Sequence, residues 1–451
     1  MTWVPHRTLT VAAAFGLTIA ARAAAAPVTF PYPVHERTLD NGLRVYVVPM
    51  DASPGVVGFS TWMSVGSRDE VEPGRTGFAH FFEHLMFHGT PTVSADQRDR
   101  QLLRLGAEDN AWTWFDETVY HTAIPAASLP ALAALEADRF QHLKLEPDPL
   151  RREAGAVYGE YRKGRADPAS VLGERLYATA FRVHPYGHDT IGLEADIAAM
   201  PEQYEAALAF FDRYYRPDHA AVLVVGDVEP EATFALVRDT YGAWTTGPAA
   251  PLPVPPEPAQ TETRRVTVDW PTEAAPLLTM GWRIGAHDAD DPSIAALELA
   301  ADLLLSPTGP LERRLVRDEP LAYAIGGGRL AMVDPGLLTI EVEARHAADL
   351  PRIEAIVREE VAKLGAEVDP AALDALRTRR TYRYLSSLDD PMTVLEVVGT
   401  SLRRDPDPAA LDRWQAALAA VTPAQVSAAV QQALVDRSLT VATLIPPAEA
   451  E

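Results

Sequence analysis

The sequence predicts an α+β fold made of two similar domains, and three observations support this prediction. The chain has 451 residues, more than the roughly 100–200 that one domain usually holds. Residues 247–258 contain six prolines, which stiffen the chain and make this stretch a semi-rigid linker. Strand-like and helix-like segments follow one another in a similar order on both sides of it. We therefore expect two related domains, at 27–246 and 259–451.

Each half is predicted to begin with two strands followed by a helix. In the first half an Asn41-Gly42 turn precedes a β-like run at 43–49, a second run covers 56–65, and a helix starts near Thr76. The second half begins with runs at 265–270 and 277–284 and an apolar helix at 294–305. Further strands are expected at 220–226, 337–343 and 439–444. Helical periodicity predicts helices at 129–145, 150–163, 348–364, 370–385 and 411–434.

Residues 1–26 have the pattern of a secretory signal peptide and are excluded from the fold. His6 and Arg7 precede an apolar run at 9–21, and an alanine-rich stretch ends at Ala26. The apolar run is shorter than the ~20 residues of a membrane-spanning helix, so cleavage near 24–26 is favoured over an uncleaved anchor. We expect the mature protein to be exported, to the periplasm or beyond the cell.

Composition excludes several classes of function. The chain has no cysteine, so thiol nucleophiles, redox motifs and cysteine-ligated zinc sites are absent, and any metal must be held by His, Asp or Glu. Asp and Glu number 63 against 40 Lys and Arg, a formal net charge of −23. Nucleic-acid binding requires a cationic surface that displaces counterions from phosphate, so this class of partner is not expected.

One segment carries a metal-binding pattern, His80-x-x-Glu83-His84. Two histidines four residues apart lie on the same face of a helix, where both imidazoles can reach one metal ion. Glu83 leaves the helix on the same side and could accept a proton from a metal-bound water. This order is the inverse of the commoner zinc hydrolase motif. The alternative, histidines on a solvated helix face, is disfavoured by the large apolar residues around them.

A catalytic zinc site normally has three protein ligands and one open position. Without cysteine, the third ligand is expected to be a carboxylate or another histidine. Glu153 and Glu160 lie seven residues apart, two turns along one predicted helix, so both can face the same direction. Taken alone, such glutamates are usually solvated.

The combination of these motifs resembles the pitrilysin/insulinase family of inverted-motif zinc metallopeptidases, in particular its short, mitochondrial-processing-peptidase-like bacterial branch. Glu160 follows His84 after 76 residues, and the similarity covers essentially the whole mature chain. It includes LDNGL at 39–43, DNAWTWFDETVY at 109–120, HPYG at 184–187, YRP at 215–217, VGD at 225–227 and PLAYA at 320–324.

The resemblance implies a fold and a set of roles. Each domain would be a mainly antiparallel sheet covered by helices, and the second would lack the metal motif. His80, His84 and Glu160 would ligate one Zn²⁺. Glu83 would be the general base. Glu153 would not bind the metal itself but would orient one of its ligands. Asn110 and Ala111 would belong to an edge strand that pairs with an extended peptide substrate.

One motif of the second domain departs from the family pattern. The family presents an arginine and a tyrosine that stabilise the substrate and the tetrahedral intermediate. Tyr323 fits, but Val316 occupies the arginine position and Arg317 comes one residue late, about 100° further round a helix. Arg317 is therefore either a catalytic residue whose register Pro320 restores, or a solvated one. In the second case a partner chain would supply the missing group. We expect a dimer, with a heterodimer of two family chains preferred over a homodimer.

Other candidates carry weaker signals. His184 and His188 could bind a metal, but their Pro- and Gly-rich context favours a turn. Gly326, Gly327 and Gly328 lack a phosphate-binding context and favour a bulge or a close substrate approach. The basic cluster Arg377, Arg379, Arg380 and Tyr382 favours a solvated helix face or a partner surface.

Two functions follow as hypotheses. The first is a zinc-dependent endopeptidase that hydrolyses peptides or unfolded segments in a closed chamber, with Glu83 as the base on zinc-bound water. The second is an inactive structural or peptide-binding subunit of a peptidase-like complex. The complete metal motif argues for the first hypothesis, whereas the displaced Arg317 argues for the second or for dependence on a partner.

Overall fold

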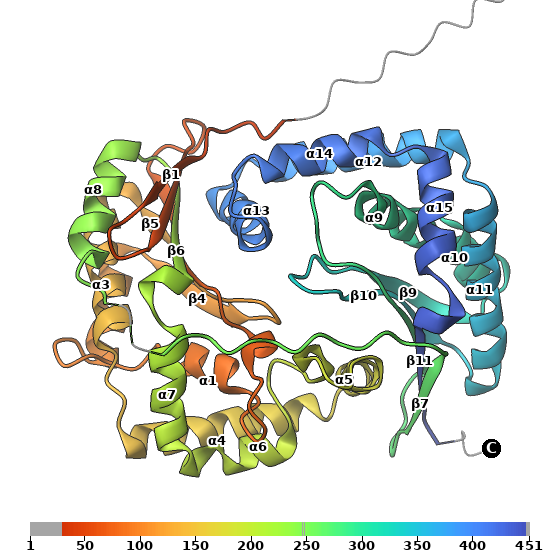
Figure 1. The fold of residues 1–451 in the computed structure, drawn as a ribbon, viewed down its shortest axis with the longest axis horizontal. Helices are drawn as coiled ribbons and strands as arrows, with labels where there is room; N and C mark the ends of the chain where they lie inside the picture. Colours follow the sequence, from red (N-terminus) through yellow and green to blue (C-terminus); the bar gives the residue numbers. More distant parts are fainter. Residues whose placement is uncertain (1–28, 246, 248, 448–451) are drawn as a thin grey trace, which may run out of the picture.

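The computed structural model describes residues 29–245, 247 and 249–447. The predicted signal peptide therefore lies outside the described residues. Within them the chain forms two halves, each built around one sheet (Figure 1).

The N-terminal sheet has the strand order β1-β2-β6-β3-β5-β4. Its strands are β1 (His35–Thr38), β2 (Arg44–Pro49), β3 (Val56–Met63), β4 (Glu108–Thr113), β5 (Thr118–Pro125) and β6 (Ala220–Gly226). The C-terminal sheet has the order β7-β11-β8-β10-β9. Its strands are β7 (Arg264–Asp269), β8 (Leu277–Arg283), β9 (Ala322–Arg329), β10 (Leu337–Ala344) and β11 (Leu439–Ile445).

Apart from β1, the two sheets have the same topology. In each sheet the first of these strands pairs in parallel with the last, as β2 does with β6 and β7 with β11. The other neighbours in the two sheets are antiparallel. The predicted α+β fold of two similar, mainly antiparallel domains is confirmed.

Helices cover both sheets. The N-terminal half contains α1 (Phe78–Leu85), α2 (Ala95–Leu105), α3 (Leu129–His142), α4 (Pro147–Gly164), α5 (Pro168–Ala180), α6 (Glu194–Ala199), α7 (Tyr204–Tyr214) and α8 (Pro230–Tyr241). The C-terminal half contains α9 (Pro292–Leu305), α10 (Pro310–Glu312), α11 (Leu350–Ala366), α12 (Pro370–Ser387), α13 (Pro391–Arg404), α14 (Ala410–Ala420) and α15 (Pro423–Ala433). The segment Pro292–Asp318 is apolar enough to span a membrane by length and composition, yet α9 within it is a largely buried core helix.

The two halves exchange helices. From the C-terminal half, α13 packs on β3 and β6 of the N-terminal sheet, and α5 of the N-terminal half packs on β8 and β11 (Figure 1). The contact of α13 is close, since a Cβ on Gly399 would lie 2.1 Å from Trp62 Cζ2. Both faces of β2 and β6 are buried, which explains why these strands are continuously apolar.

The proline-rich segment is held at its C-terminal end. Glu257 Oε2 accepts hydrogen bonds from the backbone N–H groups of Arg182, Val183 and His184, at 2.9, 2.7 and 3.0 Å. Arg283 donates to the carbonyl of Pro258 at 2.6 Å. These contacts fix the end of the segment where the chain enters the C-terminal half (Figure 1).

The single helix expected at 411–434 is wrong. The structure has two helices there, α14 and α15. Pro423 has no N–H to continue the first helix, and Thr422 caps the second by accepting from Gln425 N. The sequence also left β1, β4 and β5, and the helices α2, α5, α6, α7, α8 and α13, without an assignment from periodicity.

Candidate metal centre

The predicted motif lies on α1, whose first turn is fixed by a buried carboxylate. Glu70 accepts from the backbone N–H groups of Gly77 and Ala79, each at 2.7 Å. These are N–H groups without a partner inside the helix, and a negative charge is favourable at this helix end. Gly77 has φ 88°, and a Cβ there would lie 2.5 Å from the Ile191 carbonyl oxygen.

One face of α1 is anchored in the core. Phe78, Phe81, Phe82 and Leu85 are fully buried, and Phe82 stacks on Phe210 with ring centroids 5.3 Å apart. The helical period then turns His80, Glu83 and His84 toward α4 and β4.

His80, His84 and Glu160 form a compact cluster. Their ligand atoms all lie within 4.8 Å of one another. Glu160 Oε2 is 3.5 Å from His80 Nε2 and 3.4 Å from His84 Nε2. The Glu160 side chain is 51% exposed, so the cluster is open on the α4 side. Two imidazole nitrogens, one carboxylate and an open side match the donor set of catalytic zinc sites.

The protonation of His80 fits this use. Burial, with a smaller effect of His84, lowers the pKa of His80 to about 4, so His80 is neutral near pH 7. A metal ligand must be a neutral imidazole. His80 Nδ1 is buried without a hydrogen-bond partner among the described residues. The polar contact of this ring is therefore made by Nε2, the atom that faces the cluster.

Glu153, expected to orient a ligand, contacts two histidines. His84 Nδ1 lies 2.9 Å from Glu153 Oε1 and His88 Nε2 lies 3.1 Å from Glu153 Oε2. The hydrogen bond from His84, and next that from His88, lower the pKa of Glu153 to about 2. His88 was not singled out from the sequence, although its spacing of four from His84 was a signal.

Glu83 lies beside the cluster and is oriented by β4. Thr113 donates from Oγ1 to Glu83 Oε2 at 2.6 Å. Burial raises the pKa of Glu83, partly offset by this hydrogen bond and by His84. Asn110 and Ala111 also lie on β4, which is the edge strand of the N-terminal sheet. The general-base candidate and the expected peptide-pairing strand are thus in direct contact.

A cavity of about 760 Å³ separates the two halves next to this strand. Trp114, which follows Thr113 directly, lines it together with Phe115 and Tyr177, whose rings stack at 5.2 Å. The opposite wall is formed by β8, β9 and β10, including the glycines 326–328. Its size is within the range of ligand sites, and its walls are largely apolar.

The structure does not join Arg317 or Tyr323 to the metal cluster. Arg317 lies in a π-helical turn, Arg313–Asp318, where it donates to the Pro307 carbonyl at 2.9 Å and lies 3.8 Å from Glu312. Tyr323 is at the start of β9, half exposed, with Arg345 4.5 Å above its ring. No hydrogen bond or ion pair within the described residues links either one to the cluster.

His184 and His188 have other partners. His184 Nδ1 accepts from Tyr186 N at 3.0 Å, so its Nε2 carries the proton that is donated to Asp334 Oδ2 at 3.0 Å. His188 Nδ1 lies 3.7 Å from Glu70 Oε2. Neither belongs to a potential metal cluster of the described residues.

Comparison with known proteins identifies relatives of most of the chain. Two family models match it, "Insulinase (Peptidase family M16)" over residues 47–193 and "Peptidase M16 inactive domain" over 202–380. Zinc protease PqqE of Helicobacter pylori is 30% identical over 374 residues, which are 80% of this chain and 82% of the relative. The probable zinc protease PqqL of Escherichia coli is 28% identical over 234 residues, 50% of this chain and 25% of the relative.

Solved structures share the fold. A protease from Helicobacter pylori matches with a TM-score of 0.86 and 26% identity, over 92% of this chain and all of that one. The periplasmic protease PqqL from Escherichia coli matches with a TM-score of 0.77 and 20% identity, over 93% of this chain and 48% of that one. The chain therefore belongs to the pitrilysin/insulinase family of peptidases, peptidase family M16.

Proposed function

We propose that this chain is a zinc-dependent endopeptidase. The observation that carries the proposal is the convergence of His80, His84 and Glu160 beside a half-buried carboxylate, Glu83. Zinc held by these three residues would supply a Lewis acid that polarises a peptide carbonyl and acidifies water. Relatives that carry the name zinc protease support the same chemistry.

Glu83 is the general base that accepts the proton of the attacking water and later donates it to the leaving amine. Burial favours its protonated form, so a proton taken from the attacking water is retained until it passes to the leaving amine. Thr113 holds one carboxylate oxygen, leaving the other free to face the water. The hydrogen bond thereby fixes the orientation of the base.

The substrate in this proposal is an extended peptide or an unfolded segment. A peptide paired to the free edge of β4, at Asn110 and Ala111, would bring its carbonyls past Glu83. Its side chains would enter the cavity beyond Trp114. A folded protein could not pair with this strand without local unfolding.

The proposal includes a second family chain. This chain matches 48% of PqqL from Escherichia coli, so a single copy corresponds to about half of that protease. Arg317 is engaged by Pro307 and Glu312, which leaves the stabilisation of the tetrahedral intermediate to a partner. We propose a dimer that closes a chamber, with a heterodimer preferred, and we propose that it acts after export.

The experiment that tests the function compares Glu83→Gln with the unmodified chain. We expect the variant to keep one zinc per chain and to lose at least about 100-fold in kcat/KM on an unstructured peptide, the usual range for loss of a general base. Glu231→Gln, an exposed glutamate on α8, is the matched control and should keep full activity. Unchanged hydrolysis by Glu83→Gln would reject the mechanism.

A second candidate is a non-hydrolytic, peptide-binding subunit. The contacts that hold Arg317 within its own half favour it. Zinc binding without peptide hydrolysis, both by the chain alone and by the chain mixed with a second family chain, would support this alternative.

A further inference from the structure

His88 lies just beyond α1, in a turn that brings its ring back toward the metal cluster. The helix ends at Leu85. The next residues form a tighter turn with hydrogen bonds between residues three apart: Phe87 N donates to His84 O at 3.1 Å and His88 N donates to Leu85 O at 2.9 Å. Gly89 fixes the turn from the other side, because its carbonyl accepts from Lys144 N at 3.1 Å. The imidazole is thus held by backbone contacts on both sides.

The ring of His88 uses the carboxylate oxygen that His84 does not. Glu153 Oε1 is bound by His84 Nδ1 at 2.9 Å, and Oε2 by His88 Nε2 at 3.1 Å. An ionised carboxylate only accepts hydrogen bonds, so both ring nitrogens act as donors. With its proton on Nδ1, His84 presents the Nε2 lone pair toward Glu160.

Two donors constrain Glu153 more than one. A carboxylate with a single partner can rotate about its last torsion angle, which is a soft one. The second hydrogen bond fixes the carboxylate plane, and with it the direction of the His84 ring. The Glu153 side chain is 26% exposed, so without His88 water would reach Oε2 and the plane would be less restricted.

We propose that His88 is a positioning residue of the metal site, which acts through Glu153 to hold His84 in the tautomer and orientation that bind zinc. The proposal rests on the proposed function and deepens it, since it extends the site to His88, which binds Glu153 and is not one of the three candidate ligands. Substitution of a group that orients a metal ligand typically lowers the metal affinity 10–100-fold.

The test is the zinc affinity of the full chain, measured by competition with a chelator of known affinity. Four variants are compared with the unmodified chain: His88→Phe, His88→Gln, Glu153→Gln and the double variant His88→Phe/Glu153→Gln. His142→Phe, at an exposed position at the end of α3, is the matched control. The visible absorption of the Co²⁺-substituted protein reports the ligand geometry independently of activity.

We expect His88→Phe to weaken zinc binding about tenfold and to change the Co²⁺ spectrum. His88→Gln, whose amide can donate from a similar position, should restore most of the affinity. The double variant should bind zinc no more weakly than Glu153→Gln alone, because the two residues act as one unit. His142→Phe should match the unmodified chain, and the melting temperature of metal-free His88→Phe should change by less than about 3 °C.

Different outcomes overturn different claims. Unchanged zinc affinity and Co²⁺ spectrum in His88→Phe, additive effects in the double variant, or equal losses in the Phe and Gln variants would reject the role of His88 and leave the proposed function standing. An unmodified chain that binds no zinc would reject the proposed function itself.

Discussion

At the scale of single residues, the environment of Glu83 combines burial with one strong hydrogen bond. Burial raises the pKa of the carboxyl, while the hydroxyl of Thr113, at 2.6 Å, counteracts this effect and fixes the orientation. The motif His80-x-x-Glu83-His84 predicts which residue is the base. It does not predict Thr113, which is thirty residues away on a strand.

Thr113→Val should therefore lower kcat/KM about tenfold or more, since a hydrogen bond to a charged group contributes about 1.5–3 kcal/mol. Zinc affinity should stay unchanged, because the side-chain hydrogen bonds of Thr113 within the described residues go to Glu83 and Thr118 and to none of the three candidate ligands. Thr113→Ser keeps the hydroxyl and is the control. Steady-state kinetics on an unstructured peptide give the comparison, and a Val variant as active as the Ser variant would contradict the prediction.

At the scale of elements, the direction of α1 depends on how its first turn is built. Gly77 precedes the helix with φ 88°, in close contact with Ile191, and Glu70 binds the first free N–H groups. The placement of both histidines relative to α4 thus depends on a glycine outside the motif.

Gly77→Ala should lower the free energy of unfolding by more than Gly74→Ala. Both glycines have positive φ, at 88° and 79°, so both variants include the cost of about 1–2 kcal/mol for a left-handed side-chain residue. A Cβ at Gly74 meets nothing within 4 Å, whereas one at Gly77 meets the Ile191 carbonyl at 2.5 Å. Overpacking should add about 1–3 kcal/mol. Urea unfolding measures the difference. Equal losses of unfolding free energy in the two variants would show that the contact between the new Cβ and the Ile191 carbonyl is relieved without cost.

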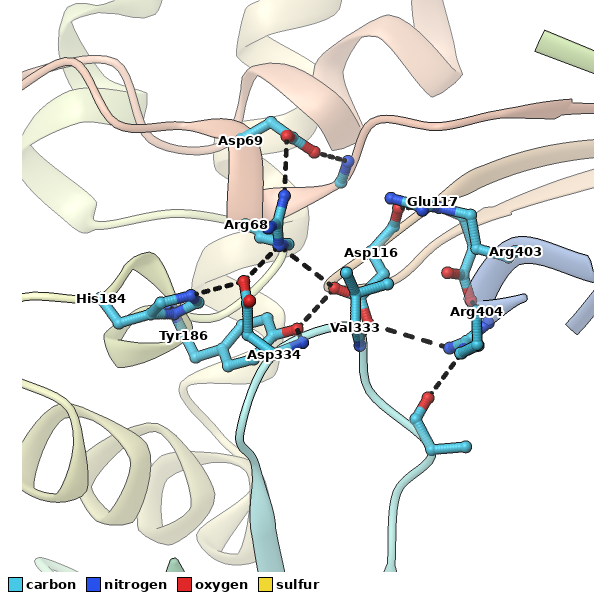
Figure 2. A network of polar contacts seen from close by, with 12 residues as sticks. Arg68, Asp69, Asp116, Glu117, His184, Tyr186, Val333, Asp334, Arg403 and Arg404 are labelled. Atoms are coloured by element: carbon cyan, nitrogen blue, oxygen red, sulfur yellow. Dashed lines mark hydrogen bonds and ion pairs between the residues drawn. The ribbon is translucent and has the colours of Figure 1, made fainter. Parts of the chain in front are cut away.

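At the scale of the whole molecule, a buried polar network joins the two halves (Figure 2). Asp116, fully buried at the β4–β5 turn, accepts from Tyr186 Oη at 2.6 Å and from Val333 N at 3.0 Å. Asp334, in the β9–β10 loop, binds Arg68 at 2.5 Å and His184 at 3.0 Å. These contacts hold the wall formed by β9 and β10 against the half that carries the metal cluster.

Asp334→Asn tests this network through its pH dependence. The hydrogen bond from His184, together with Arg68, lowers the pKa of Asp334 to about 2. A carboxylate with a lowered pKa stabilises the fold above its unfolded value near 4, and this stabilisation is lost as the pH falls from about 4 to about 2. We expect the variant to lose about 1–3 kcal/mol of unfolding free energy at pH 7.

The difference between Asp334→Asn and the unmodified chain should shrink at pH 3, as measured by urea unfolding at both pH values. Asp239→Asn is the control, since this exposed residue pairs with Arg238 at the surface and should change stability by less than about 0.5 kcal/mol. A loss that is the same at pH 7 and pH 3 would show that the charge of Asp334 is not what stabilises the interface.

The elements missed by the sequence reading have local reasons. β4 is a polar, partly exposed edge strand, EDNAWT, so it lacks the apolar alternation that predicts a strand. α13 is rich in β-branched residues and contains Gly399, a composition that disfavours helix until the packing against Trp62 is known. The π-helical turn around Arg317, whose side chain contacts Pro307 and Glu312, has no periodicity that indicates it.

Local patterns in the sequence are enough to predict the α+β fold of two similar halves, the proline-rich segment and the His80–Glu83–His84 motif. These features follow from local periodicity, composition and spacing, which act over a few residues. Only the tertiary structure decided the exchange of α5 and α13, the contact of Thr113 with Glu83, and the binding of Glu153 by both His84 and His88. A periodic pattern shows that a face is buried, but the surface that buries it comes from residues far away in the chain, and their choice depends on the packing of the whole molecule.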